Sequence, residues 1–443
     1  MLSMEHNDIL TQVGPGSPMG ELMREYWIPA CLPSELVADA TPTRLKLLGE
    51  KLIAFRDSSG RIGIMDHRCP HRCASLFFGR NESGGIQCAY HGWKFDVDGN
   101  CTEMPNIPED QKFADRVKAK AYKVAELGGI IWVYMGKRKV PPPLPAIEVL
   151  SLPAEELVVT CHQRDCNWLQ SLEGDIDTSH FGFLHVGAVQ PDDVDPNTIY
   201  RWGLIDRAPR YHVKETEWGT MYTAYRPADP GNLFYRFAHF MFPCFALVPD
   251  GNFNNMIQAT LSVPLDDSHT MTYVMGWSKR EPALRKLKDG NFIPGAAPAL
   301  NYLPTTADWL GRWRLAANRA NDYLIDRDEQ KSGKSFSGIQ GIGSQDQAMV
   351  ESMEGSEEGI VDRSFEHLAP SDRMISVTRR RLIAAAQAHQ RDGSIPITVD
   401  RPDLARGARG GSFIASDKVD WLDAYAQELR RAQSPMDFLQ AGE

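Results

Sequence analysis

The chain has 443 residues, is 42% hydrophobic and carries a net charge of −10. That length and composition suffice for two domains with substantial cores. The acidic balance argues against nucleic acid as a partner, because a polyanion selects a basic face and the clearest basic run, Arg379-Arg380-Arg381, is too short to provide one.

No segment approaches the ~20 consecutive apolar residues that span a bilayer, so we expect no membrane partner. The N-terminus lacks the basic and apolar regions of a secretion signal, and the eight cysteines are scattered along the chain. Both features are typical of a reducing cytoplasm, where clustered cysteines serve a metal. We therefore expect a cytoplasmic protein.

In chain order, "PMGELMREYW" predicts a short amphipathic helix at 18–27 within an N-terminal helical segment, 1–42. From 43 onward the pattern changes to short apolar runs separated by turns, which is typical of antiparallel strands. The proline-rich stretch at 137–145 excludes both helix and central strand. It places the end of an all-β domain, 43–140.

Beyond this linker the pattern of strands returns and then gives way to segments of helical period. The strands are predicted at 155–165 and 197–280, and the helices at 306–328, 371–391 and 417–432. The fold class is therefore α+β, with an antiparallel sheet flanked by helices and a helical C-terminal extension in a second domain that spans 141–443.

Two loops of the first domain carry the first cluster of metal ligands. Cys69-x-His71 is followed, after sixteen residues, by Cys88-x-x-His91. Zinc accepts two thiolates and two imidazoles, although zinc fingers usually place their histidine pair on one helix. One cysteine and one histidine from each β-rich loop suit a Rieske [2Fe–2S] centre better, in which one iron takes two thiolates and the other two imidazoles. Structural zinc stays the alternative.

The surrounding stretches, "CPHRCASLFFG" and "CAYHGWKFDVDGNC", resemble the Rieske domain of aromatic-ring oxygenases. The resemblance implies that Cys69 and Cys88 bind one iron of the cluster and that His71 and His91 bind the other. Cys73 departs from the family, in which glycine or a small residue is usual at this place. Because the facing loop offers no cysteine to pair with it, we expect Cys73 to be a buried free thiol.

A second cluster lies in "NWLQSLEGDIDTSHFGFLH", where Asp177, His180 and His185 fall within nine residues. Asp177 and His180, three apart, are predicted to share a helix face. His180 and His185 lie about 140° apart on an ideal helix, so they meet at one metal only if the helix ends or bulges near Gly182. Two imidazoles with one carboxylate are the ligand set of non-haem Fe(II) sites that activate O₂.

This stretch resembles the catalytic-domain motif of Rieske oxygenases, Glu/Asp/Asn-x₃-Asp-x₂-His-x₄-His, which falls on Glu173, Asp177, His180 and His185. The resemblance implies that the two histidines bind iron. It also implies that Asp177 bridges an iron-ligand histidine to His91 of a Rieske centre across a subunit boundary.

The third iron ligand in this family is a carboxylate far downstream. "GIQGIGSQDQAMVESM" resembles the corresponding stretch of phthalate-type oxygenases and indicates Asp346. Asp322 and Asp326 are competitors within a predicted helical run, where they suit surface charges. Asp362, in a polar stretch, is the third competitor.

Nearly the whole chain resembles the phthalate dioxygenase branch of the Rieske non-haem iron oxygenase α subunits, which also contains O-demethylases of methoxylated lignin-derived aromatic acids. The resemblance implies a terminal oxygenase component that uses O₂ to hydroxylate or dihydroxylate an aromatic carboxylate, like a phthalate 4,5-dioxygenase. It also implies a homotrimer or stacked trimers. An aromatic carboxylate requires a cation in the pocket, and Arg207, Arg210 and Arg236 are candidates.

A separate reductase with flavin and iron–sulfur groups is expected to supply electrons from NAD(P)H, because the chain has neither a G-x-G-x-x-G fingerprint nor the cysteine run of a plant-type ferredoxin. Two alternatives stay open. An O-demethylase would hydroxylate a methyl group and release formaldehyde. An electron carrier or zinc-stabilised binding protein would contain no mononuclear iron.

Overall fold

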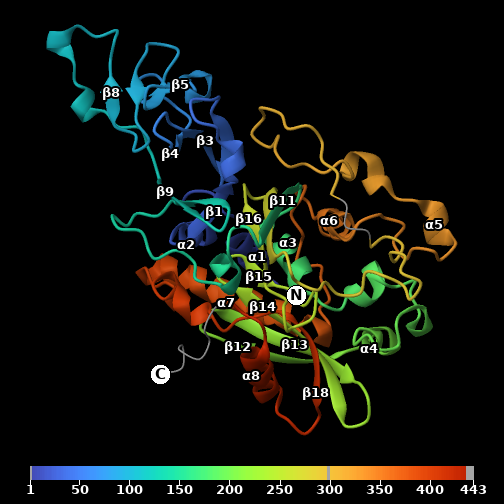
Figure 1. The fold of residues 1–443 in the computed structure, drawn as a ribbon. Helices are drawn as coiled ribbons and strands as arrows, with labels where there is room; N and C mark the ends of the chain where they lie inside the picture. The colour runs from blue at the N-terminus through green and yellow to red at the C-terminus, as the bar shows by residue number, and fades with distance from the viewer. Residues whose placement is uncertain (1, 297–299, 436–443) are drawn as a thin grey trace.

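The computed structural model describes residues 2–296 and 300–435. Figure 1 shows a small β-rich lobe, drawn blue to teal, which projects from a larger lobe built on one large sheet with helices around it. The small lobe contains the predicted Rieske loops and the large lobe the second cluster. The predicted α+β fold class is confirmed.

Two antiparallel sheets form the small lobe, in the orders β2-β3-β4 and β5-β6-β7-β8. Leu48 and Gly49 connect β2 to β3, and both have positive φ (47° and 77°), as a type I′ hairpin turn requires. Apolar side chains of these strands form a separate core that also buries both predicted cluster cysteines. The strands are Thr43–Leu47 (β2), Glu50–Arg56 (β3), Ile62–Asp66 (β4), Arg80–Glu82 (β5), Gly85–Gln87 (β6), Lys94–Phe95 (β7) and Cys101–Glu103 (β8).

A third small sheet joins the lobes. Its strands are Trp27–Cys31 (β1), Ile130–Tyr134 (β10) and Lys123–Leu127 (β9), in the order β1-β10-β9. Trp132 of β10 stacks on Phe245 in the large lobe, with ring centroids 6.4 Å apart, so one core runs through both. The chain then passes through 137–145, which contains neither helix nor strand, as the proline run predicts.

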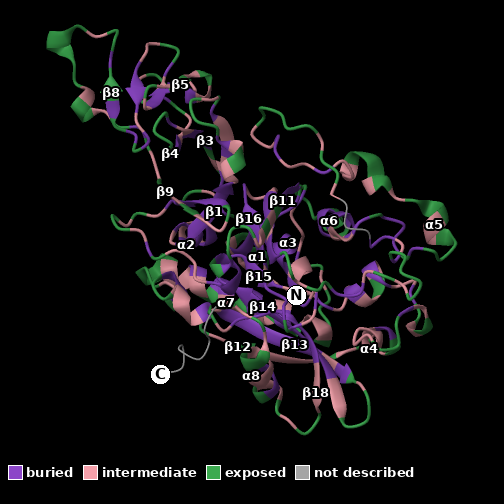
Figure 2. Ribbon diagram, in the orientation of Figure 1, coloured by how far each residue is buried: buried purple, intermediate pink, exposed green. Residues whose placement is uncertain are grey.

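The large lobe contains an eight-stranded antiparallel sheet in the order β11-β17-β16-β15-β14-β13-β12, with β18 also paired to β14. Figure 2 shows its central strands almost entirely buried, because helices and loops cover both faces. The strands are Leu157–Arg164 (β11), Arg210–Glu215 (β12), Gly219–Pro227 (β13), Asn232–Met241 (β14), Phe245–Leu247 (β15), Gln258–Pro264 (β16), Thr270–Trp277 (β17) and Gly411–Ser416 (β18).

Helices α3 and α7 pack on this sheet, α3 against β15 and β16 and α7 against β12 and β13. No helix in the described ranges is long and apolar enough to cross a membrane. The helices are Met4–Thr11 (α1), Pro18–Arg24 (α2), Trp168–Ile176 (α3), Arg201–Ile205 (α4), Arg327–Lys331 (α5), Ile342–Ser352 (α6), Arg373–Asp392 (α7) and Trp421–Arg431 (α8).

The helix predicted at 306–328 is wrong. Only a kinked 3₁₀ segment, Arg319–Leu324, and the start of α5 are helical there. Three consecutive residues, Asp322, Tyr323 and Leu324, have φ between 50° and 54°, a left-handed conformation that no right-handed helix tolerates. The periodic pattern in this stretch therefore does not lead to a helix.

A buried ion network ties three helices together behind the second cluster. Glu173 of α3 accepts hydrogen bonds from Arg379 of α7 (2.5 and 2.8 Å) and from Arg363 (3.1 Å), which also donates to Asn7 of α1 (3.1 Å). Burial alone would raise the pKa of Glu173, but the two guanidinium groups outweigh it and lower the pKa below its usual range.

We predict that Glu173→Ala lowers the free energy of unfolding by about 3–5 kcal/mol, because it leaves two arginines buried without their carboxylate. Urea denaturation measures the change. Asp403→Ala, which breaks an exposed pair with Arg401, serves as the control and should change stability by less than about 0.5 kcal/mol. Equal small effects would contradict the role of the network.

The pH dependence has a definite sign. Because folding lowers the pKa of Glu173, the contribution of the network is present at neutral pH and is lost as the pH falls through and below the ordinary glutamate value of 4.5. Glu173→Gln should therefore flatten the dependence of stability on pH in that range.

Candidate metal centres

The loop after α3 brings two histidines to one point. Helix α3 ends at Ile176, and the chain resumes as one π-helical turn, Phe181–His185, in which the Val186 amide donates to the Phe181 carbonyl (3.2 Å). A π turn aligns residues that an α-helix would separate. As a result, the Nε2 atoms of His180 and His185 lie 3.1 Å apart. The predicted bulge near Gly182 is confirmed.

Asp346 reaches the same point from the first half of α6. Its Oδ1 lies 3.1 Å from Nε2 of His185 and 3.5 Å from Nε2 of His180, and the three ligand atoms lie within 4.8 Å of one another. Burial would raise the pKa of Asp346, but the adjacent imidazoles outweigh it and hold the pKa at about 2. A charged carboxylate with two imidazoles fits a divalent iron that leaves positions open for O₂.

The competing carboxylates either have other hydrogen-bond partners or lie in another part of the fold. Asp326 caps α5 by accepting hydrogen bonds from the backbone amides of Asp328 and Glu329. Asp362 accepts hydrogen bonds from the amide and hydroxyl of Ser364. Asp322 lies in the left-handed segment before α5. Of the four candidates, only Asp346 is brought to the two histidines.

Asp177 approaches His180 through a turn after α3 and not along a shared helix face. The prediction that it shares a helix face with His180 is wrong, because Asp177 has extended backbone at the C-terminal end of α3. Its Oδ1 instead accepts from the amide and hydroxyl of Ser179 (2.7 and 2.8 Å), and Oδ2 lies 3.5 Å from Nδ1 of His180. The turn therefore aims the Asp177 carboxylate at the outer nitrogen of His180.

Gln345, which the sequence reasoning missed, orients His185. Its Oε1 accepts from Nδ1 of His185 (2.7 Å), while its amide donates to the carbonyls of Gly295 and Ile339 (3.0 and 2.8 Å). These bonds place the His185 proton on Nδ1 and leave Nε2 free to bind a metal. Its position directly before Asp346 is the only sequence signal that could have indicated Gln345.

The two loops of the small lobe repeat one hydrogen-bond pattern around their cysteines. The Cys69 amide donates to the Ala74 carbonyl, and the Cys88 amide donates to the Trp93 carbonyl. The donor–acceptor distance is 2.8 Å in both. Each cysteine carbonyl then accepts from the residue four positions on, Cys73 in one loop and Gly92 in the other. The predicted cluster residues therefore occupy equivalent turns.

Cys73 corrects one expectation. It is a free thiol, but it is exposed rather than buried. Its φ is +59°, and the equivalent Gly92 has a φ of +77°. Glycine is favoured at such a position because it carries no Cβ, which explains the family preference from which Cys73 departs.

The residues of these loops fit an iron–sulfur cluster. Cys69 and Cys88 are buried, and amides of the first loop donate to the Cys69 sulfur. The rings of His71 and His91 lie side by side, with centroids 4.5 Å apart, and Nδ1 of His71 is buried without a partner in the described part of the chain. Two sulfurs and two imidazoles thus converge between the loops, as a Rieske cluster requires.

A cavity of about 200 Å³ lies beside His180, His185 and Asp346. Strands β11, β14, β16 and β17 contribute to its wall, with His162 and Arg236 among the polar side chains that line it. This cavity lies where a substrate would meet a bound iron.

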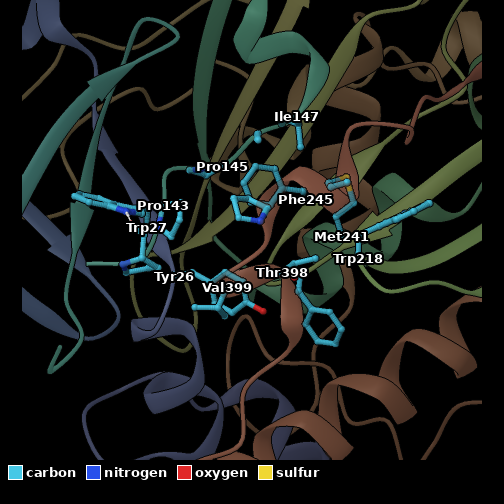
Figure 3. Close-up of a pocket in the computed structure, with 15 residues that line it drawn as sticks. Tyr26, Trp27, Pro143, Pro145, Ile147, Trp218, Met241, Phe245, Thr398 and Val399 are labelled. Carbon is cyan, nitrogen blue, oxygen red and sulfur yellow. Dashed lines mark hydrogen bonds between the residues drawn. The ribbon is translucent and has the colours of Figure 1, made fainter. Parts of the chain in front are cut away.

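A second cavity, of about 40 Å³, lies behind the linker (Figure 3). Its lining contains apolar side chains such as Trp27, Pro143 and Phe245 but no histidine, cysteine or carboxylate. It therefore offers no metal site.

Fold and sites together define an oxygenase that pairs an iron–sulfur electron-transfer domain with a mononuclear iron domain. Comparison with known families agrees: the Rieske [2Fe-2S] domain matches residues 26–122, and the LigXa C-terminal domain-like family matches 133–436. The chain belongs to the Rieske non-haem iron oxygenases as an oxygenase subunit. Its cofactors are a Rieske [2Fe–2S] cluster and a mononuclear iron.

Two curated relatives cover nearly the whole chain. The oxygenase subunit of 3-chlorobenzoate-3,4-dioxygenase from Comamonas testosteroni is 48% identical over 97% of this chain and 99% of its own length. The oxygenase subunit of phthalate 4,5-dioxygenase from Pseudomonas putida is 36% identical over 96% and 95%. The fold also matches the oxygenase in the reduced oxygenase–ferredoxin complex of carbazole 1,9a-dioxygenase, with a TM-score of 0.52, 18% identity and coverage of 88% and 97%.

We predict that His180→Ala lowers the iron content from about three to about two atoms per chain, since a cluster contains two irons and the variant removes one ligand of the third. Metal analysis together with the visible absorbance of the cluster measures both sites. The absorbance should be unchanged, and its loss along with the third iron would contradict the separation of the sites.

We also predict that Gln345→Leu weakens iron binding about 10- to 100-fold, because it removes the hydrogen bond that orients His185. Iron titration of the metal-depleted protein measures this. Gln347→Leu is the matched control, since Gln347 is buried on the same helix but its side-chain oxygen lacks a partner among the described residues. Equal losses would contradict the orienting role.

Proposed function

We propose that this oxygenase subunit hydroxylates or dihydroxylates an aromatic carboxylate. In this proposal, the mononuclear iron is bound by His180, His185 and Asp346, and the cluster by Cys69, His71, Cys88 and His91. The Rieske domain occupies residues 43–140 and the catalytic domain 141–443, after an N-terminal segment, 1–42. Bound Fe(II) supplies the activation of O₂, and the cluster supplies single electrons.

The observation that carries the substrate class is a buried cationic end of the main cavity. Arg236 lines this cavity, and its Nη2 donates to the Pro249 carbonyl (3.3 Å). Its Nε has no partner in the described residues, and its guanidinium lies 4.3 Å from the ring centroid of Phe181. Asp250, an acidic residue in the same wall, accepts hydrogen bonds from Arg285 (2.6 and 2.7 Å). Arg236 is therefore available to a substrate.

The groups around Arg236 include further hydrogen-bond donors. Arg226, on the same face of the neighbouring strand, is a second buried arginine, and its Nε and Nη1 lack partners in the part of the chain that the structure describes. The hydroxyls of Tyr200 and Tyr211 are also buried, and neither has a hydrogen-bond partner among the residues that the structure describes. Burial, followed by the charge of Arg236, lowers the pKa of Arg226 to about 10. Unpaired donors and two positive charges favour an anion such as a carboxylate.

The other candidate arginines are less suited. Arg207 donates to the carbonyls of Gly182 and Val189, which fixes the π turn, and Arg210 is exposed. Arg236 alone of the three is both buried and in the wall of the cavity. The proposal therefore assigns the carboxylate to Arg236.

We propose that electrons arrive from a neighbouring subunit. Asp177 and His180 are partly exposed beside the cavity, whereas the small lobe with the cluster projects far from α6 (Figure 1). Exposed aromatic side chains lie near both sites, Phe183 and Phe336 beside the π turn and Tyr90 beside His91. A homotrimer or stacked trimers would cover these surfaces and bring the partner's His91 to Asp177.

The electron donor is proposed to be a separate reductase with flavin and iron–sulfur groups, which takes electrons from NAD(P)H in the cytoplasm. Structural neighbours include an oxygenase bound to a ferredoxin, which is an electron donor of this kind.

The test is a panel of aromatic acids with reductase, NADH and O₂, in which oxygen uptake and product are measured together. We expect uptake that depends on an aromatic carboxylate and incorporation of labelled oxygen into the ring. Release of formaldehyde from a methoxylated acid would indicate the O-demethylase alternative. No uptake with any aromatic acid, with both metal sites intact, would contradict the proposal.

We predict that Arg236→Gln raises KM for the carboxylate substrate about 10- to 100-fold, because a charged hydrogen bond is lost in a buried site. The control is Arg210→Gln, which changes an exposed arginine in the same sheet and should leave KM within about twofold. Steady-state kinetics measure both variants. An unchanged KM in Arg236→Gln would show that the carboxylate binds elsewhere.

A further inference from the structure

The end of the cavity opposite Arg236 has a different character. His162 of β11 lies in its wall with only 3% of its surface exposed, and both of its ring nitrogens lack partners among residues 2–296 and 300–435. Thr272, directly opposite His162 on β17, also lines the cavity with a buried hydroxyl that has no partner. Nε of Arg164, two residues along β11, is a third unpaired polar atom in this wall.

A buried histidine whose two ring nitrogens both lack hydrogen-bond partners is unusual in the interior of a protein. Burying an imidazole without hydrogen bonds costs free energy, and native structures satisfy most buried polar atoms. The chain does so where no ligand arrives: His239, another fully buried histidine, contacts the Arg409 carbonyl through Nε2 (3.0 Å). Unsatisfied polar atoms that gather in a cavity next to metal ligands are typical of a binding site.

The charge at this end is balanced, unlike that at the Arg236 end. Arg164 donates to Ser171 (2.8 Å) and lies 3.8 Å from the Asp175 carboxylate, which offsets its charge. Burial lowers the pKa of His162 to about 3, so the ring is neutral at physiological pH. A neutral imidazole offers one donor and one acceptor, and the Thr272 hydroxyl offers both.

A ligand group that binds at this end of the cavity must match these hydrogen-bond donors and acceptors. A carboxylate only accepts hydrogen bonds, so it could use His162 only as a donor, and it would meet no net positive charge. A halogen or methyl group would satisfy none of the polar atoms. A hydroxyl group both donates and accepts, and it fits the neutral imidazole, the threonine and the Arg164 N–H together.

The two ends lie well apart along the sheet. His162 is on β11 and Arg236 on β14, four strands away in the order β11-β17-β16-β15-β14. The iron-site residues line the same cavity. A substrate anchored at both ends must therefore carry its second polar group on the side of the ring away from the carboxylate.

We infer that His162, with Thr272, binds a hydroxyl group on the substrate ring distal to the carboxylate that Arg236 holds, and so selects hydroxylated aromatic acids. This inference rests on the proposed function for the carboxylate end. It assigns His162 a positioning role and gives it no part in metal binding.

The test compares 4-hydroxybenzoate with 4-methylbenzoate, which have nearly the same shape but differ in hydrogen bonding at the distal position. Binding to the oxidised holoenzyme without reductant is measured by calorimetry. We expect His162→Phe to weaken 4-hydroxybenzoate about tenfold or more and to change 4-methylbenzoate by less than about twofold. Thr272→Val should act in the same direction, more weakly.

The stability of the variants separates binding from structure. Because His162 makes no hydrogen bond within the described residues, His162→Phe should not lower the melting temperature of the holoenzyme. His162→Gln, which keeps a donor and an acceptor, should restore part of the affinity for 4-hydroxybenzoate. Cluster absorbance and iron content confirm that each variant is loaded.

Equal weakening of both ligands in a stable variant, or no weakening of either, would overturn the inference. If Arg236→Gln leaves both acids unaffected, the carboxylate assignment fails instead. The distal site is then tested with phenol against toluene, which need no carboxylate anchor. Phenol binding that His162→Phe does not weaken would also overturn the inference, and it would show that solvent satisfies His162.

Discussion

The π turn at Phe181–His185 is the constraint on which the iron site depends. His180 and His185 lie five positions apart, a spacing that an α-helix would direct to different sides, and the turn places their Nε2 atoms 3.1 Å apart. Arg207 supports this backbone by donating to two carbonyls, one of them within the turn. With the histidines fixed, a single carboxylate from α6, Asp346, joins them in a group of three side chains that could hold a metal ion.

Much of this could be predicted because the chemistry is local. The two Cys–His loops need only their own short turns, and the two histidines with Asp177 occupy nine residues. Simple helix geometry even required the bulge near Gly182 that the structure contains. Asp346 was accessible only through a resemblance, since nothing in its own neighbourhood distinguishes it from Asp322 or Asp326.

What could not be predicted depends on contacts between distant parts of the chain. Gln345 meets His185 across 160 positions, and Arg363 meets Glu173 across 190, so no sequence window contains either pair. β18 adds to β14 from the C-terminal region by the same kind of distant pairing. The prediction for 306–328 is wrong for the opposite reason. Its local period favours a helix, but the left-handed residues around Tyr323 exclude one.

The unsatisfied polar groups of the cavity indicate which kinds of substrate it would bind. A fold selected only for stability would pair Arg226 and Arg236 with carboxylates and would pair His162 with a carbonyl, as it pairs His239. The cavity instead has, within the described residues, an unpaired arginine nitrogen at one end and an unpaired mixed donor–acceptor set at the other, and we propose that a bound ligand satisfies them. Discrimination follows directly, because a ligand that lacks either polar group leaves these atoms unpaired in the complex.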